Sequence, residues 1–164
     1  MRTHLCGEVT EKLLETKSGG EVTLCGWVDT RRDHGGVIFI DLRDHTGKVQ
    51  VVVEPENGDA FDATRNVRNE YCLKIRGHVR ARPEGQINEK LVTGRIELVA
   101  DVVTVLNSCP PLPFQLDEHA SEETRLKYRY LDLRRDAMQE AIRLRSRLTH
   151  AIREHLSSRD FLDI

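Results

Sequence analysis

Alternation of hydrophobic and polar positions predicts five β-strands in the first two thirds of the chain. The strands are bounded by turn-forming residues and cover residues 21–28, 37–43, 48–54, 71–82 and 94–106. Between the third and fourth strands, residues 59–69 carry apolar side chains at the spacing of one short helix. Three strands, a helix and two further strands are the order of an OB-fold, a five-stranded closed β-barrel. The sequence therefore predicts a mainly β domain over residues 1–106.

The same alternation predicts which strand residues face the barrel interior, because successive side chains of a strand point to opposite faces. The predicted inward residues are Val22, Leu24, Val28, Ile38, Ile40, Leu42, Leu73, Ile75, Gly77, Val79, Ala81, Ile96, Leu98, Ala100 and Val102. Gly26 lies among them and allows a bend or a close approach of another strand. The paired glycines Gly35 and Gly36 indicate a turn. The face of residues 71–82 that points outward is largely cationic.

The last third of the chain is predicted to be a linker followed by helices. Three of the five prolines fall between residues 107 and 114, which favours an extended connection, and residues 107–135 are interpreted as a linker or hinge. Ser121 is suited to the N-cap of a helix. From Asp136, a second N-cap candidate, apolar residues recur at helical spacing to Leu156. Residues 136–164 are therefore interpreted as the truncated start of another domain, with a strand-like segment at its end.

Composition limits the classes of protein and of site. The chain has 164 residues, 38% of them hydrophobic, and no apolar run approaches the roughly 20 residues that span a bilayer. No apolar segment of the kind found in signal peptides is present, so a cytoplasmic protein without membrane association is expected. The net charge of -2 means that any nucleic-acid surface is local. The four cysteines and seven histidines show no spacing of metal ligands, so no metal site is predicted.

Phe39 is an aromatic residue on the polar face of a predicted strand, where it can stack on an unpaired base. By the same alternation Gln50 and Glu97 lie on the polar faces of their strands, beside the cationic row of residues 71–82. Cations hold phosphates, while amides and carboxylates discriminate base edges, and a carboxylate suits the N–H donors of guanine. This face is therefore predicted to bind RNA. A plainer interpretation stays open, in which Phe39 packs under a loop, Glu97 pairs with Arg82 and the cationic row is simply solvated.

Several long motifs follow one another in an order that is typical of one enzyme family. They occupy residues 2–4, 6–7, 24–28, 31–36, 39–44, 93–97, 125–135 and 161–164. Through these motifs the chain resembles, over essentially its whole length, the N-terminal portion of bacterial-type aspartyl-tRNA synthetases. Lysyl- and asparaginyl-tRNA synthetases share the Tyr-Leu-Asp-Leu segment, but the opening motif and the region of Phe39 match the aspartyl family.

The resemblance implies that the barrel binds the anticodon loop of a tRNA. In the family pattern Phe39 stacks on the central uracil, Gln50 hydrogen-bonds this base, and Glu97 reads the guanine in the first position. The other anticodon-binding residues that the resemblance implies are Arg32, Arg80, Arg82 and Asn88. Thr30 departs from the basic residue that is common at its position, which puts one phosphate contact in doubt. Some bacterial members with a histidine at the position of His34 also charge asparagine tRNA, whereas others carry leucine there, so a relaxed reading of the third position is a hypothesis.

For the full-length enzyme the resemblance implies attachment of aspartate to tRNA with ATP and Mg²⁺, in a class II catalytic domain that forms a homodimer through its first motif. Residues 136–156 correspond to the long helix of this motif, but the chain ends before either ATP-binding motif. We therefore expect no catalytic residue, no cofactor and no formation of aspartyl-adenylate in this chain. The alternative is a free-standing OB-fold RNA-binding module or regulator derived from a synthetase. A free module has little use for an unpartnered apolar helix face, so the fragment interpretation predicts that residues 136–164 are disordered, self-associated or folded only with missing sequence.

Overall fold

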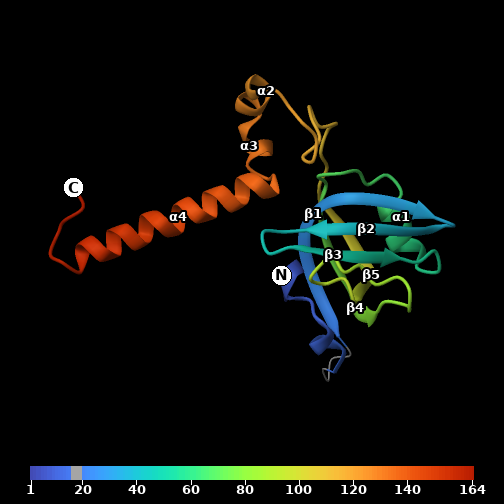
Figure 1. Ribbon diagram of the computed structural model, residues 1–164. Helices are drawn as coiled ribbons and strands as arrows, with labels where there is room; N and C mark the ends of the chain where they lie inside the picture. Colours follow the sequence, from blue (N-terminus) through green and yellow to red (C-terminus); the bar gives the residue numbers. More distant parts are fainter. Residues whose placement is uncertain (16–19) are drawn as a thin grey trace. The chain divides into compact units, whose positions relative to one another are not determined.

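The computed structural model describes residues 1–15 and 20–164 (Figure 1). The chain divides into two compact units, Met1–Pro110 and Pro111–Ile164. The first unit holds all the strands, two short 3-10 helices, η1 (Cys6–Glu8) and η2 (Glu11–Glu15), and the helix α1 (Gly58–Thr64). Among the described residues, no helix is long and apolar enough to cross a membrane.

Five strands of the first unit close into a ring in the order β1-β2-β3-β5-β4 (Figure 1). Their bounds are β1 (Glu21–His34), β2 (Val37–Arg43), β3 (Lys48–Val53), β4 (Cys72–Ala81) and β5 (Ile96–Asn107). All neighbouring strands pair antiparallel except β3 and β5, which pair parallel. Since α1 follows β3 in the chain, the predicted order of three strands, a helix and two strands is confirmed.

Alternate residues of the strands fill the interior of this ring with aliphatic side chains. Ile38, Ile40 and Leu42 of β2 are fully buried, as are Leu73 and Ile75 of β4, which confirms the inward positions predicted for them. Phe39 is only partly buried and lies outside this core cluster. The pleat of β2 therefore separates an aliphatic interior from an outer face that carries an aromatic ring.

Two predicted inward positions are wrong, and both lie where the regular alternation stops. Arg76 pairs with Val102 while the adjacent Gly77 pairs with Ala100, so Asp101 is an extra residue in β5. Such a bulge reverses the faces of the residues that follow it, and Val102 is 42% exposed whereas Val103 is 8% exposed. At the end of β4, Ala81 is exposed although the alternation places it inside, because the strand ends there.

A second bulge, at Asp29, decides which side chains of β1 reach the outer face. Val28 pairs with Leu42 but Thr30 pairs with Asp41, so β1 gains one residue at this point. Because of this extra residue, Arg32 pairs directly with Phe39 and shares its face. β1 continues to His34, further than predicted, and the turn is confined to Gly35 and Gly36. Both of these glycines adopt positive φ angles, 62° and 88°.

In the second unit, three helices are present: α2 (Glu122–Lys127), α3 (Arg129–Asp132) and α4 (Asp136–Ser157). The predicted N-cap at Ser121 is confirmed, because its side chain accepts a hydrogen bond from the backbone N–H of Thr124. The N-cap of α4 is Arg135 instead of Asp136, so the helix starts one residue earlier than predicted. Residues 161–164 form no strand, since no neighbouring strand supplies hydrogen bonds to their backbone.

Candidate nucleic-acid interface

A row of polar residues crosses the outer face of the strand ring. Thr30 of β1 lies opposite Asp41 of β2, and Asp41 lies opposite Gln50 of β3. Next to β3 in the ring, Glu97 of β5 lies opposite Arg80 of β4. A side-chain hydrogen bond from Gln50 to Glu97 joins the two parts of this row, so all five strands contribute to one polar surface.

Glu97 is the centre of this surface and is almost fully buried, with 2% of its side chain exposed. Its Oε1 accepts a hydrogen bond of 2.7 Å from Nε of Arg80, and its Oε2 accepts one of 2.9 Å from Nε2 of Gln50. Arg80 also binds Glu54, at 2.7 Å through Nη1. Burial alone disfavours the charge of Arg80, but its hydrogen bonds to Glu97 and Glu54 outweigh burial and raise the pKa of Arg80. Two carboxylates therefore hold this guanidinium in place.

Arg82 is not the ion-pair partner of Glu97 that the plainer interpretation named. Its guanidinium binds backbone carbonyls instead, with Nε donating to Ile96 at 3.0 Å and Nη1 to Gln86 at 3.4 Å. The residue is 8% exposed, and burial lowers its pKa. Among the described residues, Nη2 of Arg82 has no hydrogen-bond partner. Arg82 is thus buried by the loop after β4, while the charges of Glu97, Asp41 and Arg32 on the outer face still act on it.

Phe39 presents its ring on the outer face next to the polar row. Directly across from it on β3 lies Val52, which is 1% exposed, and on β1 lies Arg32. The imidazole of His34 approaches the Phe39 ring edge-on, with centroids 6.2 Å apart and planes at 61°. The ring thus rests on an aliphatic neighbour and is flanked by a cation and an imidazole. A partly exposed ring so supported is suited to stacking on a base.

Arg32 is held by Asp41, a residue that the sequence analysis did not select. Both oxygens of Asp41 accept hydrogen bonds from Nη2 of Arg32, at 3.1 and 3.0 Å. Burial raises the pKa of Asp41, and the positive charge of Arg32 opposes this rise. Asp41 shares the strand parity of Phe39, so the alternation of β2 contains the signal that could have identified it. Arg32 remains 44% exposed, which leaves part of its guanidinium accessible.

Asn88 lies in the loop between β4 and β5, at a point where two backbone segments touch. Its backbone N–H donates to the carbonyl of Gly94 at 3.0 Å, and its side-chain oxygen accepts from the backbone of Lys90 at 3.1 Å. A Cβ atom on Gly94 would lie 1.8 Å from the carbonyl oxygen of Asn88. Only glycine fits there, so Gly94 sets the position of Asn88 relative to the start of β5.

Known proteins match both units of the chain. Residues 22–106 match the family model of the OB-fold nucleic acid binding domain, and residues 121–164 match that of tRNA synthetases class II (D, K and N). The chain is 53% identical over 165 residues to the Aspartate--tRNA(Asp/Asn) ligase of Ruthia magnifica subsp. Calyptogena magnifica. That alignment covers 100% of this chain and 27% of the relative, so the chain spans about a quarter of its length.

Solved structures show the same fold. The asparaginyl-tRNA synthetase from Pyrococcus horikoshii, complexed with asparaginyl-adenylate, matches with a TM-score of 0.81 and 28% identity over 98% of this chain and 35% of that chain. The aspartyl tRNA synthetase from Entamoeba histolytica matches with a TM-score of 0.84 over 96% of this chain and 37% of that chain. At 22% identity this second likeness concerns the fold alone. The chain therefore belongs to the OB-fold nucleic acid binding family through residues 22–106, and its residues 121–164 are similar to the class II tRNA synthetases of the D, K and N group.

Proposed function

We propose that this chain is the tRNA anticodon-recognition part of an aspartate-tRNA ligase. Residues 1–106 act as the anticodon-binding domain, residues 107–135 as the linker, and residues 136–164 as the start of the catalytic domain. The relative with 53% identity is an aspartate-tRNA(Asp/Asn) ligase, which supports the substrate class. The family of residues 22–106 supports nucleic-acid binding.

The observation that carries the proposal is the position of the Phe39 ring beside the Gln50–Glu97 hydrogen bond. The ring stacks on the central uracil of the anticodon. Gln50 uses its N–H group for Glu97, so its amide oxygen can accept a hydrogen bond from the uracil. Each oxygen of Glu97 accepts one hydrogen bond within the protein and keeps a further lone pair for the N–H groups of the guanine in the first position.

The cationic side chains of the surface have two different roles in this proposal. Arg32 is 44% exposed and can contact the anticodon while Asp41 fixes its orientation. Arg80 binds two carboxylates and acts mainly by positioning Glu97. Arg82 and Asn88 support the loop between β4 and β5 at the edge of the surface.

The activity of the longer protein is part of the proposal. It attaches aspartate to tRNA in the cytoplasm, with ATP and Mg²⁺ bound in the catalytic domain, and α4 contributes to a homodimer. Among the described residues, no three His, Cys, Asp or Glu side chains gather where they could hold a metal ion.

Binding of two anticodon stem-loops tests the proposal. The first carries the aspartate anticodon and the second differs only in its central base. The chain should prefer the first, and Phe39→Ala should weaken this binding by roughly 1–3 kcal/mol. Phe39→Tyr keeps a ring and should bind like the unaltered chain. Phe61→Ala is the control: it removes a phenyl ring that packs against the core from α1, away from the proposed surface, and should keep the preference for the first stem-loop. Equal binding of the unaltered chain to both stem-loops would disprove anticodon recognition.

His34 carries a second part of the proposal, the charging of asparagine tRNA as well as aspartate tRNA. Its ring lies against the Phe39 ring, so it is close to the proposed base stack. The name of the relative with 53% identity includes both tRNAs. Charging assays with the full-length enzyme on both tRNAs decide the matter, and absence of activity on asparagine tRNA would reject it.

A further inference from the structure

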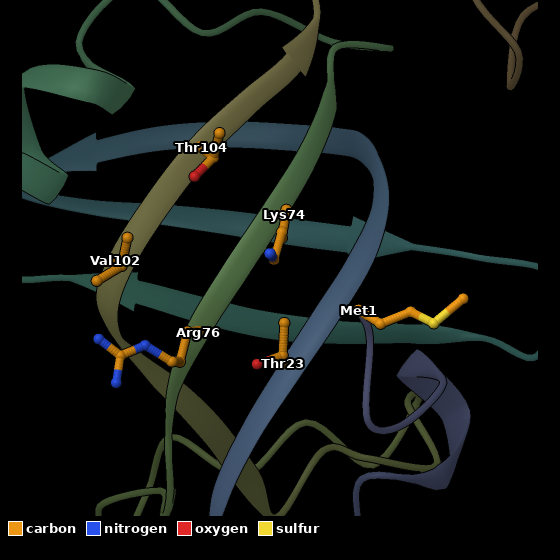
Figure 2. A pocket seen from close by; sticks show the side chains of 6 residues that line it. All are labelled: Met1, Thr23, Lys74, Arg76, Val102 and Thr104. Atoms are coloured by element: carbon orange, nitrogen blue, oxygen red, sulfur yellow. The ribbon is translucent and has the colours of Figure 1, made fainter.

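A hollow of about 150 Å³ lies on the outer surface of β1, β4 and β5, away from the residues assigned above. Figure 2 shows its lining, which comes from three neighbouring strands and the N-terminal segment: Met1, Thr23, Lys74, Arg76, Val102 and Thr104. The pairing of the strands explains the arrangement. Lys74 lies opposite Thr104, and Arg76 lies between Thr23 and Val102. Two cations and two hydroxyl groups thus share one small depression.

The charge of this hollow is weakly compensated. Within residues 1–15 and 20–164, Lys74 forms no ion pair and no side-chain hydrogen bond. Arg76 approaches Glu21 at 3.5 Å, but both side chains are more than half exposed, 51% and 56%. Pairs of this kind are loose and easily exchanged in water. Both cations are therefore available to a bound anion, and the threonine hydroxyls can donate hydrogen bonds to the same group.

The hollow is continuous with the proposed anticodon surface along β4. Leu73, Ile75, Gly77 and Val79 face the interior, so Lys74, Arg76, His78 and Arg80 form one row on the outer face. Residues two apart in a strand are separated by roughly 7 Å, so this row extends about 20 Å from Arg80 to Lys74. The end of the row at Arg80 binds Glu97, and the end at Lys74 opens into the hollow. A nucleic acid seated at Phe39 and Glu97 can therefore continue along the row.

We infer that the hollow formed by Thr23, Lys74, Arg76 and Thr104 is a binding site for a backbone phosphate of the RNA whose anticodon occupies the Phe39 surface. This inference rests on the proposed function. The site reads no base, because cations and hydroxyls bind phosphate irrespective of sequence. Its role is to position the RNA strand that leaves the anticodon, and it adds affinity without adding discrimination.

The salt dependence of stem-loop binding tests the site. In the double variant Lys74→Gln/Arg76→Gln, both stem-loops should bind more weakly by the same factor, since the contact is independent of the bases. The slope of log affinity against log salt should become roughly 0.7–0.9 less steep, because the contact to one phosphate is lost. The variant's deficit should therefore shrink about threefold between about 50 and about 200 mM salt.

Two further variants serve as controls. Arg65→Gln/Arg68→Gln removes the same charge from exposed residues in the segment after α1, and its salt slope should stay that of the unaltered chain. Glu21→Gln removes the carboxylate beside Arg76 and should tighten binding of both stem-loops.

The outcomes separate this inference from the proposed function. If Lys74→Gln/Arg76→Gln keeps the salt slope of the unaltered chain while the central base is still discriminated, the phosphate site is wrong and anticodon recognition stands. A loss confined to the matched stem-loop also overturns the inference, because the hollow would then read a base. If the unaltered chain binds both stem-loops equally, the proposed function fails instead.

Discussion

The side-chain amide of Gln50 donates a hydrogen bond to Oε2 of Glu97, across the parallel pairing of β3 with β5 and over 47 residues of sequence. This bond joins a residue proposed to bind the central base to one proposed to read the first base. Arg80 completes the arrangement from β4. The two side chains proposed to read the anticodon thus orient each other through this hydrogen bond.

Replacing Arg80 tests whether it positions Glu97. Arg80→Ala leaves the buried Oε1 of Glu97 without a donor, and we expect the free energy of unfolding of the first unit to fall by about 1–2 kcal/mol. Arg76→Ala removes a cation from the same face of the same strand, where the ion pair is exposed, and should cost less than about 0.5 kcal/mol. Urea unfolding followed by the fluorescence of the single tryptophan, Trp27, measures both. Equal stabilities of the two variants would contradict the positioning role.

The sequence predicts which side chains point to the outer face of the strands, but not which hydrogen bonds and ion pairs these side chains form. Alternation alone places Phe39, Gln50 and Glu97 outside the core, because β2, β3 and the first residues of β5 contain no irregularity. The partner of Glu97 could not be predicted in the same way. Arg80 and Arg82 share one parity, and the choice between them depends on where β4 ends and how the following loop folds over Arg82. Which arginine pairs with Glu97 is therefore set by tertiary contacts.

The loop that carries Asn88 gives a second prediction. A Cβ at position 94 would overlap the carbonyl oxygen of Asn88, so Gly94→Ala must displace the loop. We expect a loss of about 1–3 kcal/mol in stability and weaker binding of the matched stem-loop. Gly58→Ala is the matched control, since nothing lies within 4 Å of its added Cβ and its φ angle is not positive. This variant should be neutral or more stable by up to about 1 kcal/mol. Thermal unfolding of both variants gives the comparison, and a stable Gly94→Ala chain would refute the steric argument.

The bulges mark where prediction of the fold from sequence stops. The regular strands β2 and β4 follow the alternation to within a residue or two. In β5, however, the extra residue Asp101 exposes Val102 and buries Val103, although both are valines and nothing in the local pattern distinguishes them. In β1 the extra residue Asp29 brings Arg32 onto the face of Phe39. Bulges depend on how neighbouring strands pair, which a single strand's sequence does not specify.

Stability of the second unit should depend on pH through Asp132. This carboxylate is fully buried and receives Nε of Arg125 at 2.8 Å and Nη1 of Arg129 at 2.6 Å, with Arg135 at 3.8 Å. The hydrogen bond from Arg125 and the surrounding positive charges hold the pKa of Asp132 below its ordinary value of 3.8. A lowered pKa in the folded state stabilises the fold above pH 3.8, and this contribution is lost as pH falls through the lowered value.

The packing of Leu131, which is 2% exposed, reports on this dependence. We expect its methyl resonances in NMR spectra to lose their folded positions as pH falls from about 5 to about 2. Asp132→Asn should already show the loss at neutral pH, because three arginines then face no carboxylate. Asp117→Asn alters an exposed carboxylate in the same unit and should leave the transition in place. An identical pH profile in Asp132→Asn would show that another group governs it.

The apolar stripe of α4 gives the last prediction. Ile142, Leu148, Ile152 and Leu156 recur along one side of the helix and are 41–58% exposed. If this stripe contributes to a homodimer, the chain should associate with itself as its concentration rises. Leu148→Glu should then weaken association at least about tenfold, because the dimer would bury the unpaired charge of the glutamate. Arg147→Glu changes a residue on the opposite side of α4 and should leave association unchanged. Sedimentation equilibrium distinguishes these cases. A chain that stays monomeric at every concentration, or equal association of both variants, would exclude this side of α4 as the interface.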